Sequence, residues 1–179
     1  MNQEEFKIQS LLKQEADFLI DCVKELDPWL IDIFINIQEQ NQKRNKQDNH
    51  RNQGNKRNQI DNQLEKEGFG HSQIKHLMRA TAQASGLKEL CLFIRYQMGR
   101  DDQRKNWNKA VRNKTLGEAV IEQLNQIEAK AKSLVSADDP PAFQRQLFLR
   151  MAERFFHYWS WQYRFLQSQA LEQRGRTGR

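Results

Sequence analysis

The chain has few of the residues that cross-link or interrupt a polypeptide: two cysteines, three prolines and eight glycines in 179 residues. Cys22 and Cys91 form no CxxC pair, so we expect two reduced thiols in a cytoplasmic protein rather than a disulfide framework or a zinc site. The most apolar run, 29–37, is short and contains Asp32, so we expect no membrane span. No stretch alternates apolar and polar residues as a strand does, which predicts an all-α fold.

Acidic residues are scarce after the first forty positions. Residues 1–40 have three Lys or Arg against nine Asp or Glu, a net charge of −6. Residues 41–58 have a net charge of +5 and residues 59–179 a net charge of +7, which brings the whole chain to +6. An acidic first segment followed by a basic body indicates two surfaces with different partners, and a basic body favours a polyanion, most often nucleic acid.

The composition changes abruptly after the N-terminal segment. Apolar spacing predicts acidic helices over 3–26 and 28–38, with Pro28 in the first turn of the second. Between positions 36 and 63, fifteen of 28 residues are Asn or Gln and almost none is apolar. Such a segment cannot bury enough surface to order itself, so we predict a flexible linker over 39–67.

The remainder predicts a basic helical bundle over 68–171 and an Arg/Gly tail over 172–179. Ser72 is a plausible N-cap, Gly86 and Gly99 are plausible helix ends, Thr115 is a second N-cap, and 136–141 is the clearest loop. The fold class is therefore an all-α, short-looped bundle with a long Asn/Gln-rich insertion after its N-terminal helices. The helices predicted in this part span about 72–84, 87–98, 101–112, 115–135 and 142–171.

The last predicted helix contains a cationic row with an indole in it. Steps of four, three, four and three residues place the row on one helix face, beside an apolar face. Guanidinium groups hold phosphates while an indole stacks on an unpaired base, so the row favours nucleic acid. The alternative is a solvated charged face with the indole packed on a neighbouring helix, but only two acidic residues follow position 141. The row consists of Arg150, Arg154, His157, Trp161 and Arg164.

Two further basic clusters lie earlier in the chain. Lys75 and Arg79 are one turn apart in one predicted helix, and Trp107 is interleaved with basic residues in the segment 100–114. The clusters bind one polyanion only if the bundle brings them together; otherwise they are diffuse surface charge. The second cluster includes Arg100, Arg104 and Lys109.

Catalytic and metal-binding signatures are missing from the sequence. There is no HExxH, no paired Cys/His spacing and no Gly-rich phosphate loop, so we expect neither an enzyme nor a cofactor or metal. A metal-independent ribonuclease remains an alternative, with His76 and His157 as its acid and base. That alternative predicts RNA cleavage that is lost in a His76→Ala variant.

Three short motifs resemble the small helical subunit of type III CRISPR effector complexes. They are Ser72-Gln73-Ile74-Lys75 at a helix start, Tyr96-x-x-Gly99-Arg100 at a helix end, and the aromatic-rich stretch 151–156. The family typically reads Thr-Ser-Gln-Ile-Arg and Tyr-Ala-x-Gly-Arg at the first two. His71 and Lys75 depart from this pattern, as do the insertion and the acidic first helix, which indicates a divergent member.

The resemblance implies a non-catalytic subunit that contacts the backbone of guide RNA and target RNA and packs against other subunits and copies of itself. It implies that Lys75, Arg79, Arg95 and Arg100 face RNA, with Gly99 ending a helix so that Arg100 turns toward it. The alternative function, from a different class, is a helical protein–protein adaptor whose acidic first helix docks a basic partner.

Overall fold

The computed structural model describes residues 3–36, 70–101 and 106–177, with side chains to residue 170. The predicted all-α fold is confirmed: helices make up most of the described chain, and its one sheet is a two-stranded hairpin. The predicted linker, 39–67, lies outside the described residues, as does Arg104. Within the described residues no helix is long and apolar enough to cross a membrane.

The elements follow one another with short connections. Residues 27–36 are also helical and follow the first two helices directly. The labelled elements are α1 (Gln3–Gln14), α2 (Ala16–Lys24), α5 (His71–Gln83), α6 (Leu87–Gly99), β1 (Ala110–Val111), β2 (Lys114–Thr115), α7 (Leu116–Ser133) and α8 (Phe143–Thr177).

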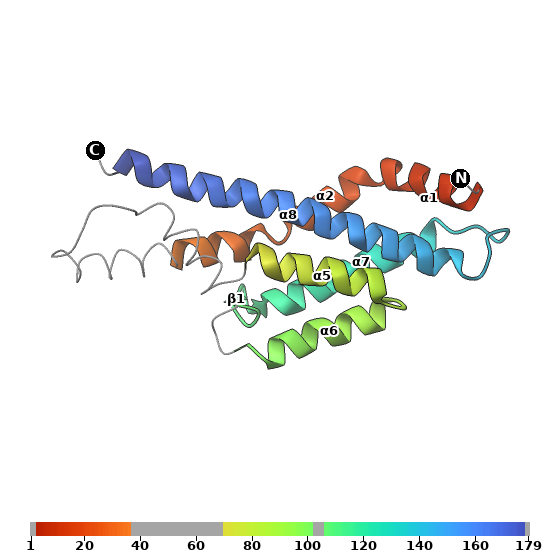
Figure 1. Cartoon of the computed structure of the whole chain (residues 1–179), viewed down its shortest axis with the longest axis horizontal. Coiled ribbons are helices and arrows are strands. Elements are labelled where there is room, and N and C mark those ends of the chain that lie inside the picture. The colour runs from red at the N-terminus through yellow and green to blue at the C-terminus, as the bar shows by residue number, and fades with distance from the viewer. Residues whose placement is uncertain (1–2, 37–69, 102–105, 178–179) are drawn as a thin grey trace.

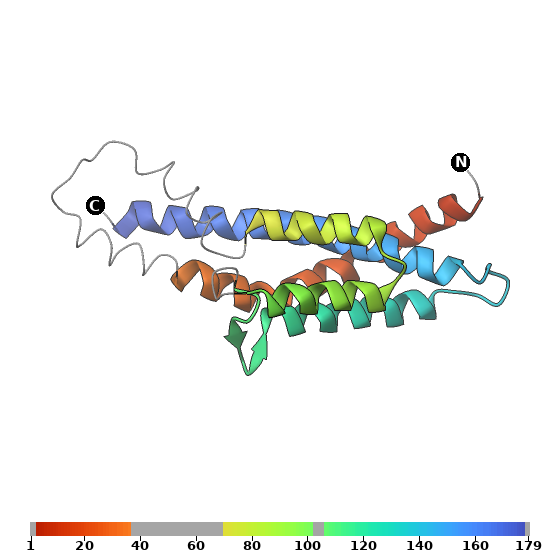
Figure 2. The same cartoon turned by 60° about the horizontal axis from the view of Figure 1, so that its bottom comes forward.

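Four helices form a closed arrangement in which α8 packs on α5 and α7, and α6 packs on the same two helices (Figures 1 and 2). The pair α1 and α2 also packs on α8. The core between these layers is aromatic along α8, where the Phe155 and Trp159 rings stack with centroids 6.3 Å apart. Helix α8 therefore covers the apolar faces of α1, α2, α5 and α7, whereas α6 packs on α5 and α7.

The predicted single helix over 3–26 is wrong, because the chain bends at Glu15 between α1 and α2 (Figure 1). Glu15 has φ −95° and ψ 14°, although its N–H still donates to the Leu11 carbonyl at 2.9 Å. Its side chain is buried, and the Lys130 ammonium of α7 lies 3.0 Å from its carboxylate. The bend places this carboxylate against α7, a contact that helical periodicity does not reveal.

The predicted cationic helix over 101–112 is also wrong. Residues 110–115 form an antiparallel hairpin, in which Ala110 pairs with Thr115. Its two-residue loop, Arg112 and Asn113, has φ of +53° and +63°, as a type I′ turn requires. Tertiary contacts hold this conformation, since the Trp29 indole N–H donates to the Lys114 carbonyl at 2.9 Å.

Helix boundaries in the bundle follow the sequence closely, with differences at three ends. Thr115 caps α7 as predicted, accepting from the Glu118 N–H at 3.3 Å. Ser72 is not the N-cap of α5; Gly70 is, and its N–H donates to the Gln73 side-chain oxygen at 3.0 Å. Helix α5 ends at Gln83, before Gly86, and α8 continues to Thr177, which extends helix into the predicted tail.

Candidate nucleic-acid interface

The cationic row of α8 lies on a solvent-facing side of that helix. Arg150 and Arg164 are exposed and Arg154 is half-buried. Four residues of the row line a groove of about 490 Å³ between α8 and α1, whose far wall includes Gln9 and Leu12. The structure thus brings together the residues that the spacing placed on one face, and adds a wall from α1 that the spacing did not show.

Trp161 is 66% exposed, so the alternative in which it packs on a neighbouring helix is wrong. Its ring lies beside that of Tyr158 on the same helix, with centroids 5.4 Å apart. One turn later Phe165 is 54% exposed. Side chains four residues apart are neighbours on a helix, so these aromatics form a strip beside the arginines.

Arg150 has acidic partners that the sequence argument missed. Its guanidinium lies 3.3 Å from the Glu153 carboxylate and 3.8 Å from that of Glu5 on α1. Counting acids only after position 141 overlooked Glu5, which is distant in sequence and adjacent in space. Among the described residues no carboxylate lies in ion-pair range of Arg154 or Arg164, so these two have the free cationic charge of the row.

The residues grouped by the family resemblance lie on two helices, α5 and α6. Lys75 and Arg79 are exposed on α5, and Arg79 lines a groove between α5 and α6. Arg95 is exposed on α6. Burial raises the pKa of the Cys91 thiol one turn earlier, while Arg95 lowers that pKa and Glu128 of α7 raises it.

Arg100 bends back onto its own helix. Its guanidinium donates to the Tyr96 hydroxyl at 2.8 Å and lies 5.2 Å from the centre of the Tyr96 ring. Gly99 is the last residue of α6, as predicted, but its φ is not positive and open space surrounds it. The turn of Arg100 therefore does not require a glycine at that position.

Two of the described cations in the cluster at 100–114 form ion pairs within the fold. The Lys109 ammonium is 2.9 Å from the Asp32 carboxylate, and Lys114 pairs with Glu122 of α7 at 2.5 Å. Trp107 is buried at 1% exposure, so its ring belongs to the core rather than to the basic surface. These contacts join the hairpin to α7 and to the helix 27–36.

The two histidines of the ribonuclease alternative lie in different places. His76 lines the α5–α6 groove, whereas His157 lines the α1–α8 groove and has its Nδ1 2.9 Å from the Glu153 carbonyl. The described residues do not bring them into one site. Within the same residues, no group of three or more His, Cys, Asp and Glu side chains is placed to hold a metal ion.

Comparison with protein-family models, with curated proteins and with solved structures gives no match for this chain.

Proposed function

We propose that the protein is a non-catalytic RNA-binding protein whose α8 face holds a single strand by its phosphates and by stacking on one or more bases. The observation that supports this best is Trp161, a 66%-exposed indole between Arg154 and Arg164. A basic surface with interleaved aromatic side chains is typical of single-strand binding, because every base has a face that stacks. Exposed apolar side chains that lie together mark an interaction site, and the arginines beside them favour a polyanion as the partner.

The motif resemblance supports a narrower form of the proposal: a divergent small subunit of a type III CRISPR ribonucleoprotein, bound to guide and target RNA beside neighbouring subunits. Purification of the tagged chain from its native host, with sequencing of the bound RNA, tests this form. Guide RNAs from a CRISPR array are the expected result. RNA without any guide sequence would refute the CRISPR assignment and leave RNA binding itself in place.

The general proposal is tested by fluorescence anisotropy with single-stranded and duplex RNA over a range of salt concentrations. The double variant Arg154→Gln/Arg164→Gln should flatten the slope of log K against log salt by about 1.4, since each phosphate contact to a single strand contributes about 0.7. Arg150 is left in place because its removal would also break its pairs with Glu5 and Glu153.

The matched control removes the same charge elsewhere. Arg145 is exposed and lines a different hollow beside the α5–α6 turn, and Lys132 is exposed on α7. Arg145→Gln/Lys132→Gln should leave the slope nearly unchanged, whereas Trp161→Ala should weaken single-stranded RNA more than duplex. Equal losses in the two double variants would mean that RNA senses only net charge, and the α8 assignment would be wrong.

The adaptor alternative finds less support. Of the acids at the N-terminus, Glu5 lies against Arg150, Glu15 against Lys130 and Asp32 against Lys109. These carboxylates neutralise cations of the same chain, so a basic partner would have to displace them. Absence of salt-dependent RNA binding in the anisotropy assay would favour the adaptor.

A further inference from the structure

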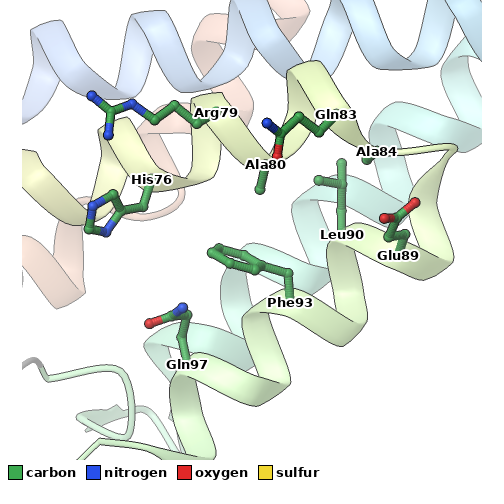
Figure 3. A pocket seen from close by; sticks show the side chains of 9 residues that line it. All are labelled: His76, Arg79, Ala80, Gln83, Ala84, Glu89, Leu90, Phe93 and Gln97. Atoms are coloured by element: carbon green, nitrogen blue, oxygen red, sulfur yellow. The ribbon is translucent and has the colours of Figure 1, made fainter.

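Helices α5 and α6 line a groove of about 360 Å³. In the fold, α5 lies between α8 and α6 (Figure 1). The two helices converge at the short turn before Leu87 and diverge away from it. Figure 3 shows the narrow end beside Ala84 and Glu89, and the wide end between His76, Phe93 and Gln97. The groove is therefore a wedge, closed at one end and open at the other.

The groove has an apolar floor and amide groups on both walls. Ala80, Leu90 and Phe93 supply the floor, and the small side chain of Ala80 leaves the space above it open. Gln83 on α5 and Gln97 on α6 each offer an amide donor and an amide acceptor. A flat, partly apolar ring with hydrogen-bonding edges matches this lining.

Charge around the groove favours an anion on the α5 side. His76 and Arg79 belong to the α5 wall, and Lys75 is exposed next to them. The carboxylate in the lining belongs to Glu89 at the narrow end, where it accepts the Ser85 N–H at 2.7 Å. A nucleotide whose base lies in the groove can therefore place its phosphate beside α5, where it faces no unpaired carboxylate of the lining.

The α8 face and this groove are one helix apart. Helices α5 and α8 run antiparallel and meet where the Ser160 hydroxyl lies 3.2 Å from His71 Nδ1 (Figure 1). Lys75 follows one turn along α5 from that contact and is exposed. A helix is about 10 Å in diameter. An extended RNA strand can cross that distance with its phosphates over Lys75.

We propose that the α5–α6 groove takes one unstacked nucleobase of a single-stranded RNA, with its ring against Phe93 and its phosphate on α5 beside Arg79. This inference rests on the proposed RNA-binding function and adds to it a second, base-occupied site. The bases that the proposal expects there are those with both donors and acceptors on their edges, because the two glutamine amides can rotate to match either.

The test fills the groove without removing a charge. Ala80→Leu places a branched side chain into the wedge, and Ala82→Leu places the same side chain on the exposed face of α5 outside it. The probe is a uridine decamer, compared with the same oligomer lacking one base and with an RNA duplex. Phe93→Leu is a second variant that keeps an apolar side chain and removes the ring face, and thermal melts check the fold of all three.

Ala80→Leu and Phe93→Leu should weaken the decamer about tenfold, within the range for loss of one stacked base, with the salt slope and duplex affinity unchanged. Ala82→Leu should bind as the parent does. Folded Ala80→Leu and Phe93→Leu proteins that bind with parental affinity would overturn the groove proposal while the α8 face still stands. Equal loss in Ala82→Leu would overturn it as well, and a parent chain that binds no RNA at all would refute the proposed function and this inference together.

Discussion

The Glu15–Lys130 pair gives the sharpest stability prediction, because its two groups differ in exposure. The Glu15 side chain is 9% exposed and the Lys130 side chain 35% exposed, with their charged atoms 3.0 Å apart. At an effective dielectric constant of about 20, two charges at that distance attract by about 5.5 kcal/mol before desolvation is subtracted. Removing one partner of a fully buried pair costs about 3–5 kcal/mol of stability. Because Lys130 is partly exposed to water, the cost of breaking this pair should be smaller.

We expect Lys130→Met to lower the free energy of unfolding by about 2–3 kcal/mol, because it leaves a buried carboxylate without its cation. Glu15→Gln should cost only about 1 kcal/mol, since the freed ammonium can reach water. In the double variant the loss should be smaller than in Lys130→Met alone. Part of the remaining cost comes from Phe18, whose ring centre lies 5.7 Å from the lysine nitrogen.

Urea unfolding followed by circular dichroism measures these differences and gives a double-mutant cycle. Lys24→Met is the matched control, because Lys24 pairs with Asp21 at 3.4 Å while both side chains are mostly exposed. That control should shift the unfolding free energy by less than about 0.5 kcal/mol. Additive effects of the two single variants, or a Lys130→Met cost as small as the control, would show that the reasoning about burial is wrong.

Three further predictions follow from single positions. Gly99→Ala should stabilise the protein by about 0.5–1 kcal/mol, because open space surrounds the added Cβ atom. Gly117→Ala should destabilise it by about 1 kcal/mol, because the added Cβ atom would lie 2.6 Å from the Met98 Cγ. Thermal melts of the two variants measure this difference. Burial raises the pKa of Cys22 to about 11. Its thiol should therefore resist alkylation at pH 8 in the native protein and react quickly in denaturant. Rapid labelling of the native protein would contradict the burial. Arg112→Gly should raise the free energy of unfolding by about 1 kcal/mol in a urea titration, because a φ of +53° strains the backbone of an arginine but not that of a glycine. A loss of stability would mean that the guanidinium makes a contact whose free energy exceeds that of the strain.

Local patterns predicted most of the helices, because their signals lie within a few residues. The Thr115 cap and the apolar seam of α7 are examples, with the helix found at Leu116–Ser133 against a prediction of 115–135. The α8 row was predicted correctly as one face for the same reason, since helix spacing alone determines it. Exposure of Trp161 then excluded the packing of its indole on a neighbouring helix, whereas nucleic-acid binding by the row stays a prediction.

The errors occur where distant residues decide the local structure. The bend at Glu15 depends on Lys130, and the hairpin at 110–115 depends on contacts of Lys109 with Asp32 and of Lys114 with Trp29. Charge counted along the chain likewise suggested free cations that the fold pairs with acids from other helices. No residue pattern within the segment 101–112 distinguishes a cationic helix from a hairpin whose charges are neutralised.

The position of α8 in the chain has a consequence for how the protein folds during synthesis. Helices α1, α2, α5 and α7 all pack on α8, which the ribosome makes after every one of them. At about 5–20 residues per second, translation of its 35 residues takes about 2–7 seconds, and during that time the faces of the four earlier helices that pack on α8 have no partner. The part of the core that lies along α8 therefore forms only after this last helix has been made.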